Sequence, residues 1–292
     1  PSAKTSSFIE YMQPTGSAER QKEIMEFFNR DGLELHQFSI CMGFASPLMA
    51  FTGLFSFLAH LNGGSGVGKT TLLRLIAGLQ FPVDGEVKIM GQNIQDLGVD
   101  ELNLIRRKQG FLFQFGALFT DLSCFENVAF PVREHFDFSE SVVKDLVLLK
   151  LETVGLRGAA SLMPAEISGG MARRVALARA TVLDPNLILY DEPFAGLDPI
   201  SLNTTAKLIK TLNLSLKATS VIVTHDVAET LEIADKVVLL SQSKNGAIIS
   251  CQGNPNEVIN FPDAGVQQFL KGSNSGPVKF HYPSPPIIDI LK

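Results

Sequence analysis

The chain of 292 residues is predicted to adopt an α/β fold that combines a parallel sheet with an inserted helical subdomain. Short apolar runs over 187–190 and 221–224 end at polar residues, as buried parallel strands do. From Thr70 onward, apolar residues recur at the spacing of one buried helix face. Between 121 and 180 the pattern is helical throughout. Strands that alternate with helices favour an α/β core, and the helical stretch favours an insertion into it.

The elements before residue 114 follow from periodicity. Residues 32–40 alternate apolar and polar positions and predict a first strand. The helix that begins at Thr70 is expected to bury Leu72, Leu75, Ile76 and Leu79. After it we expect a strand and turn over 85–94, a helix over 101–108 and a strand over 111–113. In the helical stretch, two apolar faces are expected, formed by Val142, Val143, Leu146 and Leu149 and by Met171, Val175 and Ala178.

Composition narrows the class of protein. A net charge of −5 and a pI near 5.6 give no general attraction to polyphosphates, so we expect no nucleic acid as partner. Cys41, Cys124 and Cys251 lack metal-ligand spacing and are odd in number, which suits a reducing compartment. Residues 1–20 lack the apolar segment of a signal peptide, and the cytosol is the expected location.

One stretch could argue for a membrane span. Residues 41–62 contain no Asp, Glu, Lys or Arg, and such a run is long enough to cross a bilayer. Gly43, Pro47 and Gly53 interrupt it, and its end leads directly into a glycine-rich turn. We therefore prefer buried strands or a disturbed reading frame to a membrane span for this segment.

The glycine-rich turn matches the phosphate-loop pattern G-x-x-x-x-G-K-T and lies between an apolar run and a helix. Its backbone N–H groups would converge on the phosphates of a nucleotide, while Lys69 supplies positive charge and the Thr70 hydroxyl binds Mg²⁺. A chance glycine-rich turn is the alternative, and the flanking strand and helix pattern disfavours it. The expected nucleotide-binding residues here are Gly63, Gly64, Ser65, Gly66, Val67, Gly68, Lys69, Thr70 and Thr71.

Two carboxylates follow the apolar run over 187–190. Asp191 and Glu192 stand at the carboxyl end of a predicted strand, where α/β sheets place their ligands. Asp191 would hold Mg²⁺, and Glu192 would polarise the attacking water. Taken alone, the pair could equally be two solvated carboxylates, but the preceding phosphate loop favours a catalytic role.

A second anion-binding turn lies between these motifs. Ser168, Gly169 and Gly170 precede a helix that carries Arg173, Arg174 and Arg179, and a helix N-terminus attracts anions. An ordinary helix cap is the alternative. The order of this turn, the Asp-Glu strand, Gly196-Leu197-Asp198-Pro199 and Thr224-His225-Asp226 resembles the ABC ATPase family.

The family resemblance implies further roles. The signature turn would bind the γ-phosphate of the opposite protomer, so Ser168 and Gly170 would act in trans in a homodimer. Gln114 resembles the glutamine that senses Mg²⁺, His225 the switch histidine and Asp198 the residue that couples the two sites. The chain departs from the family at Met171, which replaces a Gln, and at Ile40, which stands where an aromatic residue stacks on adenine.

The resemblance also implies the organisation of the chain as an ABC-type P-loop NTPase. We expect a RecA-like core with a small β-subdomain over 1–113 and 181–249, a helical subdomain over 114–180 and a C-terminal extension over 250–292. The Pro-rich end from Gly272 is expected to hold a neighbouring subunit.

Three segments carry a narrower resemblance, to the Mla-type phospholipid-transport ATPases. They are 113–119, 126–131 and 154–158, and Met171 and the end of the chain also fit that subfamily. The resemblance implies a homodimer at the cytoplasmic face of the inner membrane, with a permease, a STAS-domain protein and a periplasmic MCE subunit as partners. The apolar residues 115–119 would line the docking groove for a permease helix.

The sequence leaves three other functions open. A soluble ABC ATPase of repair or translation usually carries two cassettes or a long coiled insertion, and this chain has one cassette. A weakly hydrolysing, nucleotide-gated subunit would suit a lost base, yet Glu192 is present. An ABC ATPase for another transported substrate is the alternative to phospholipid transport.

Overall fold

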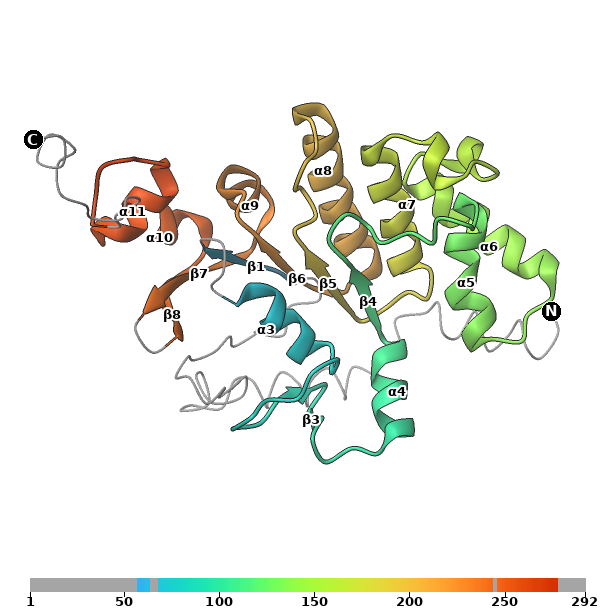
Figure 1. Cartoon of the computed structure of the whole chain (residues 1–292), viewed down its shortest axis with the longest axis horizontal. Helices are drawn as coiled ribbons and strands as arrows, with labels where there is room; N and C mark the ends of the chain where they lie inside the picture. The colour runs from blue at the N-terminus through green and yellow to red at the C-terminus, as the bar shows by residue number, and fades with distance from the viewer. Residues whose placement is uncertain (1–56, 64–67, 244–245, 278–292) are drawn as a thin grey trace, which may run out of the picture.

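The computed structural model describes residues 57–63, 68–243 and 246–277. Their main sheet has the strand order β4-β5-β6-β1-β7-β8 (Figure 1). Neighbouring strands are parallel except for β7 and β8, which are antiparallel. The strands are β1 (Phe57–Gly63), β4 (Gln109–Leu112), β5 (Leu187–Asp191), β6 (Thr219–Thr224), β7 (Lys236–Ser243) and β8 (Gly246–Gly253). The predicted parallel sheet is thus confirmed.

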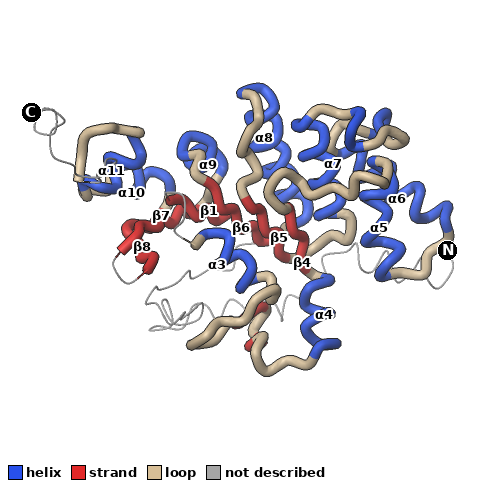
Figure 2. The backbone as a smooth tube through the Cα atoms, viewed as in Figure 1, coloured by secondary structure: helices blue, strands red, loops and turns tan. Residues whose placement is uncertain are grey.

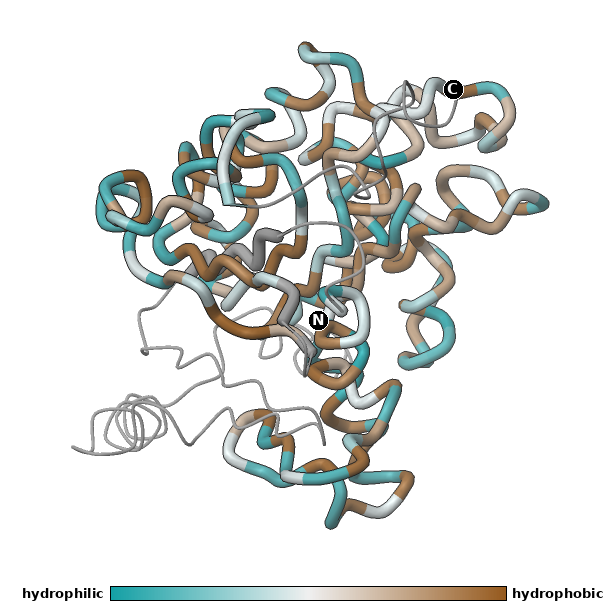
Figure 3. Tube along the Cα trace, turned by 60° about the vertical axis from the view of Figure 1, so that its left-hand side comes forward, coloured by the Kyte–Doolittle hydropathy of each residue, from teal (hydrophilic) through white to brown (hydrophobic). Residues whose placement is uncertain are grey.

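Helices cover both faces of this sheet (Figure 2), which explains why β5 and β6 are apolar at successive positions. On one face, Leu189 and Val221 pack with Leu73 of α3 (Lys69–Ile76). On the other, Ile188 and Ile222 pack in a second cluster with residues of α8 (Pro199–Leu216). A further helix, α9 (Val227–Ile233), follows β6. Figure 3 colours the described chain by hydropathy, and the helical coils carry both hydrophobic and hydrophilic segments.

The helix after the phosphate loop is shorter than the periodicity predicts. Leu75 and Ile76 are fully or almost fully buried, as expected, whereas Leu79 is 51% exposed, so its placement in the core was wrong. The cause is local: α3 ends at Ile76, and Gly78 has φ +65°, a left-handed conformation that turns the chain away from the helix axis.

The small β-subdomain contains an antiparallel hairpin over the segment where a strand and turn are predicted. Its strands are β2 (Lys88–Ile89) and β3 (Gln92–Asn93), joined by Met90 and Gly91, both with positive φ. Positive φ at both turn residues matches the twist of a tight hairpin. The helix α4 (Val99–Arg107) follows and covers most of the predicted helical segment.

The helical subdomain is built from α5 (Cys124–His135), α6 (Glu140–Thr153) and α7 (Gly169–Thr181), with the short 3-10 turns η1 (Arg157–Ala159) and η2 (Pro164–Glu166). The three helices share one apolar core of their own. Leu146 is buried as expected, but Leu149 is 54% exposed. The buried face of α6 instead continues through Val147 and Leu151, so the prediction for Leu149 was wrong.

The C-terminal part packs on the far edge of the sheet. Helices α10 (Pro255–Ile259) and α11 (Ala264–Lys271) contribute Val258 and Val266 to a cluster with Val237 of β7. The boundary expected at residue 250 lies within β8.

Several predicted features lie outside the described residues. They are the strand over 32–40, the adenine-stacking position Ile40, phosphate-loop residues 64–67 and most of the Pro-rich tail, 278–292. Of the charge-free run over 41–62, residues 57–62 belong to β1, between β6 and β7. Among the helices of the described residues, none has the length and apolar character needed to span a membrane.

Candidate active site

The phosphate loop leads from the central strand into α3. Gly63 ends β1 and is paired with Leu240 of β7. Gly68, at the start of α3, has φ +83°, a conformation that side-chain-bearing residues rarely adopt. Lys69 follows and is 7% exposed. Its Nζ donates a hydrogen bond to the Thr224 carbonyl oxygen at 3.1 Å, so the end of β6 fixes the direction of the lysine side chain.

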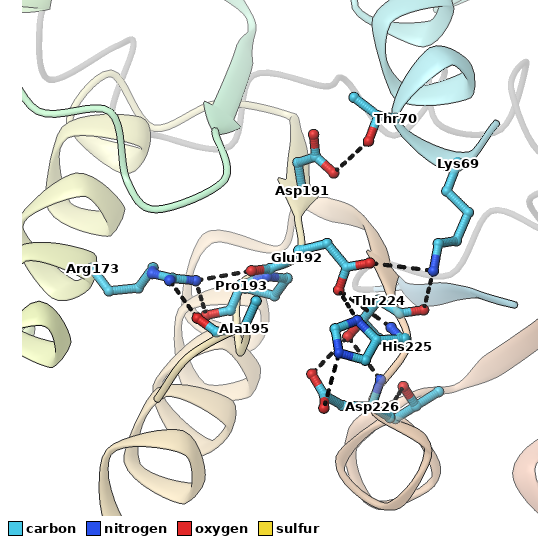
Figure 4. A network of polar contacts seen from close by, with 11 residues as sticks. Lys69, Thr70, Arg173, Asp191, Glu192, Pro193, Ala195, Thr224, His225 and Asp226 are labelled. Atoms are coloured by element: carbon cyan, nitrogen blue, oxygen red, sulfur yellow. Dashed lines mark hydrogen bonds and ion pairs between the residues drawn. The ribbon is translucent and has the colours of Figure 1, made fainter. Parts of the chain in front are cut away.

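Asp191 and the first turn of α3 form an oxygen-rich pair. Asp191 ends β5 and is 5% exposed, and the Thr70 hydroxyl donates to its Oδ1 at 3.1 Å (Figure 4). Burial raises the pKa of Asp191 above its usual range, the bond from Thr70 opposes that shift, and the charge of Glu192 adds to it. A buried carboxylate beside a hydroxyl offers the oxygen ligands that Mg²⁺ takes, so these residues fit the ion.

Glu192 lies at the centre of a polar cluster. Its Oε1 is 3.2 Å from Lys69 Nζ, and its Oε2 is 2.8 Å from His225 Nδ1 (Figure 4). The His225 backbone N–H also donates to Oε2, at 3.3 Å. An ionised carboxylate only accepts, so the contact with His225 requires a proton on Nδ1. The carboxylate therefore engages two groups, Lys69 and His225, that could also contact a phosphate.

The backbone around Glu192 explains the direction of its side chain. Glu192 has φ +47°, which is uncommon for a residue other than glycine. Its N–H donates to the Val223 carbonyl oxygen at 2.9 Å. The turn after β6 is fixed in a similar way, because the Thr224 hydroxyl accepts from the Asp226 N–H at 3.1 Å and donates to the Asp226 carboxylate at 3.0 Å. His225 lies between these two residues and faces Glu192.

The signature turn lies at the start of α7. Ser168 is exposed and caps this helix, and its Oγ accepts from the Met171 N–H at 3.2 Å. Gly169 and Gly170 form the first helical residues. A Cβ added to Gly170 would lie 2.8 Å from the hydroxyl oxygen of Ser201, so the starts of α7 and α8 are close together.

Asp198 belongs to this second group. It caps α8, and its Oδ1 accepts from the N–H groups of Ile200 and Ser201, each at 3.0 Å. Hydrogen bonding from Ser201, first of all, lowers the pKa of this exposed carboxyl. Within the described ranges, no hydrogen bond or ion pair joins the Asp198 or Ser168 side chain to the Glu192 cluster.

Two further predicted residues take no part in the hydrogen bonds and ion pairs of the cluster among the described residues. Gln114 follows β4, is exposed and precedes three residues with positive φ, namely Phe115, Gly116 and Ala117. Thr71 lies in α3 next to Thr70 and is half-buried. The structure thus brings together Lys69, Thr70, Asp191, Glu192 and His225, and not Gln114, Thr71, Ser168, Gly169, Gly170 or Asp198.

Sequence reasoning gave no particular role to Arg173. This arginine of α7 is 4% exposed, and its guanidinium donates to three carbonyl oxygens in the turn after Glu192 (Figure 4). Burial lowers its pKa from the usual value for arginine. The sequence indicates only that α7 is basic, and a buried arginine on such a helix leaves no separate signal.

Comparisons with known proteins agree with this arrangement. Residues 57–195 match the ABC transporter family. The intermembrane phospholipid transport system ATP-binding protein MlaF of Haemophilus influenzae is 53% identical over 227 residues, which cover 78% of this chain and 84% of that protein. MlaF of Escherichia coli K12 is 50% identical over 227 residues, covering 78% and 83%.

More distant relatives extend the comparison. The probable ribonucleotide transport ATP-binding protein mkl of Mycobacterium leprae is 42% identical over 219 residues, covering 75% of this chain and 62% of that protein. A solved dimeric, post-hydrolysis state of the ATP-binding cassette MJ0796, bound to ADP and Pi, superposes with a TM-score of 0.63 and 32% identity. The match covers 72% of this chain and 89% of that one. This likeness confirms the predicted P-loop NTPase fold. The identity to these relatives over most of their length shows that the chain belongs to the ABC transporter family and is one of its ATPases.

Proposed function

We propose that this ATPase is the ATP-binding subunit of a system that moves phospholipid between the inner and outer membranes. The observation that supports it most is the 50–53% identity to two phospholipid transport ATP-binding proteins over more than four-fifths of their length. The relative named for ribonucleotide transport is less similar and is covered over a smaller share. Phospholipid is therefore the better supported cargo.

The polar cluster supports hydrolysis of Mg-ATP. Mg²⁺, when bound, neutralises charge on the β- and γ-phosphates. Thr70 and Asp191 would hold it, with Gln114 reaching it from the loop after β4. Lys69 and His225 would transfer their contacts from the Glu192 carboxylate to the phosphates, which frees Glu192 to accept a proton from the attacking water. The presence of this carboxylate in the cluster disfavours a subunit that barely hydrolyses ATP.

The signature turn supports a head-to-tail pair of copies. Ser168 and Gly169 are exposed at the N-terminus of a helix of 13 residues, and helix N-termini attract phosphate. In the pair, Ser168 and Gly170 of one copy would face the nucleotide of the other, and Asp198 would lie beside them. The dimeric cassette that this chain resembles supports the same assembly.

A groove supports the docking of a membrane permease. It has a volume of about 430 Å³ and lies among α4, β4, α5 and α7. Four phenylalanines line it, and its charged or titratable side chains are Arg106, Arg107, His135 and Arg179, with no Asp or Glu among the lining residues. Burial, followed by the charge of Arg107, lowers the pKa of His135. The groove is thus lined by aromatic rings and by side chains that can donate hydrogen bonds.

The charges of the groove indicate the segment that would dock. Arg107 lines the groove and is exposed, and no Asp or Glu lines it. We infer that the permease presents an apolar cytoplasmic segment with at least one carboxylate, which would meet the Arg107 guanidinium. Of the predicted lining residues 115–119, Ala117 and Phe119 line the groove, whereas Leu118 packs into the apolar cores.

The remaining partners rest on the resemblance alone. A STAS-domain protein and a periplasmic MCE subunit would complete the complex, with this chain at the cytoplasmic face of the inner membrane. The function is tested by reconstituting the copurified complex in vesicles and following ATP-dependent transfer of labelled phospholipid. Transport of a ribonucleotide, with no transfer of lipid, would reject the proposed cargo.

The docking proposal has its own test. Arg107→Glu reverses a charge in the groove, and Lys210→Glu is the matched reversal on the exposed face of α8. We expect Arg107→Glu to leave ATPase activity of the isolated chain within about twofold, because exposed substitutions change little in the fold. It should abolish copurification with the permease, and Lys210→Glu should not. Unimpaired copurification of the Arg107 variant would rule out this groove as the docking site.

A further inference from the structure

Arg173 connects the signature helix to the turn that follows the catalytic carboxylate. Its Nη1 donates to the carbonyl oxygens of Glu192 and Pro193, and its Nη2 donates to that of Ala195, each at 2.8 Å (Figure 4). The side chain is almost fully buried. Within the described residues, none of its salt-bridge or hydrogen-bond partners is a carboxylate. A buried cation that carbonyl groups alone solvate is costly to fold, so it needs a reason beyond stability.

The geometry of Glu192 supplies that reason. With φ at +47°, this residue has a left-handed backbone, which costs about 1–2 kcal/mol for an L-residue. Its N–H is held by the Val223 carbonyl oxygen, and its C=O is held by Arg173. The peptide groups on both sides of the Glu192 Cα are therefore fixed. Because they set the direction of the Cα–Cβ bond, they direct the carboxylate toward Lys69 and His225.

Arg173 also touches the loop that carries Gln114. Its guanidinium carbon lies 5.7 Å from the centroid of the Phe115 ring, within the range of a cation–π contact. Farther along α7, Arg179 donates to the carbonyl oxygens of Gly116 and Ala117, at 2.7 and 2.9 Å. One helix thus holds both the turn after Glu192 and the residues after Gln114.

We propose that Arg173 is a positioning residue for ATP hydrolysis, which holds the Glu192 backbone so that the carboxylate faces the attacking water. Unlike Ser168, which is proposed to act on the nucleotide of the other copy, Arg173 acts within its own chain. This inference rests on the proposed role of Glu192 as the base. Through Arg173, a shift of the start of α7 would also shift Glu192. A change at the signature turn would therefore reach the base of the same chain.

The test compares Arg173→Gln with Arg174→Gln in the chain of 292 residues. Arg174 is the next residue of α7, but its guanidinium donates to the Val154 carbonyl oxygen, at 3.0 Å, away from the catalytic turn. We expect Arg173→Gln to lower kcat by about 10²-fold, the scale of a misplaced reacting group. KM for ATP and binding of a fluorescent ATP analogue should stay within about threefold, because Lys69 and Thr70 are untouched. Arg174→Gln should leave kcat within about twofold.

Two further variants separate positioning from damage to the fold. Arg173→Lys keeps a donor that can reach one of the carbonyl oxygens, and we expect it to recover part of the lost kcat. Adding Arg173→Gln to Glu192→Gln should lower the single-turnover rate no further, because the base that Arg173 positions is gone. If Arg173→Gln reduces ATP binding and kcat in parallel, or if its effect persists in the double variant, the positioning role is overturned.

The same variants distinguish the role of Glu192 as the base from the role of Arg173 in positioning it. Parental turnover in Glu192→Gln alone would reject the base itself. Loss of turnover in Glu192→Gln together with near-parental kcat in Arg173→Gln would keep the base and reject the positioning role.

Discussion

Replacement of Glu192 by Gln should lower the stability of the protein more without nucleotide than with it. The amide keeps the size of the side chain but removes the negative charge that lies 3.2 Å from Lys69 Nζ. The two side chains are 8% and 14% exposed, so the ion pair is mostly shielded from water. Removing one partner of a buried pair costs about 3–5 kcal/mol. Because Lys69 keeps its bond to the Thr224 carbonyl oxygen, we expect a smaller loss, about 1–3 kcal/mol.

This loss should be visible in thermal unfolding. At about 2–4 °C per kcal/mol, the Tm of the nucleotide-free variant should fall by several degrees. A bound, non-hydrolysable ATP analogue gives Lys69 a phosphate partner in both proteins, so the difference in Tm should shrink. Hydrolysis should meanwhile fall by about 10²–10⁴-fold, since an amide cannot accept the proton of water. Phosphate release within about threefold of parental, or an equal Tm deficit with and without the analogue, would refute this reasoning.

Three further predictions follow from the site and the packing. A mixture of Lys69→Ala and Ser168→Glu chains should regain part of the ATPase activity that each lacks alone, because mixed pairs contain one intact composite site; activity in either variant alone would contradict the trans arrangement. Asp191→Asn should lower kcat by about 10²-fold and raise the Mg²⁺ concentration needed for half-maximal phosphate release, and an unchanged Mg²⁺ dependence would remove Asp191 from the metal site. Gly110→Ala should lower the free energy of unfolding in urea by about 2–3 kcal/mol, because the added Cβ would overlap a backbone carbonyl oxygen of α7. Gly158→Ala has open space around the added Cβ and should change this free energy little. Equal effects of the two substitutions would argue against the close approach of Gly110 to α7.

The hydrophobic pattern predicted the strands best where both faces of the strand are buried. The runs at 187–190 and 221–224 are strands because both of their faces are covered, which makes every position apolar. The prediction of 111–113 was displaced from β4 (Gln109–Leu112), since Gln109 and Gly110 carry no strand signal and pair only because β5 lies beside them. Phe113 instead lines the groove, and its apolar character reflects that surface.

The sequence predicted those residues of the candidate active site that follow the carboxyl ends of the parallel strands. The carboxyl ends of neighbouring parallel strands meet at one edge, so motifs after β1, β5 and β6 predict that Lys69, Asp191 and His225 lie close together. The contact of His225 with Glu192 depends on side-chain packing that no motif encodes. Arg173 was missed because its partners are carbonyl oxygens of a turn, and any sequence could supply those.

The pairing of β1 sets the order in which the chain can fold. This strand forms its parallel bonds with β6 and β7, whose partner residues begin at Thr219 and Lys236. During synthesis β1 therefore leaves the ribosome long before its partners, and at about 5–20 residues per second the wait lasts on the order of ten seconds or more. The helices α5, α6 and α7 have a core of their own and can assemble in that interval. A growing chain would thus form its helical subdomain while β1 still lacks both of its partner strands.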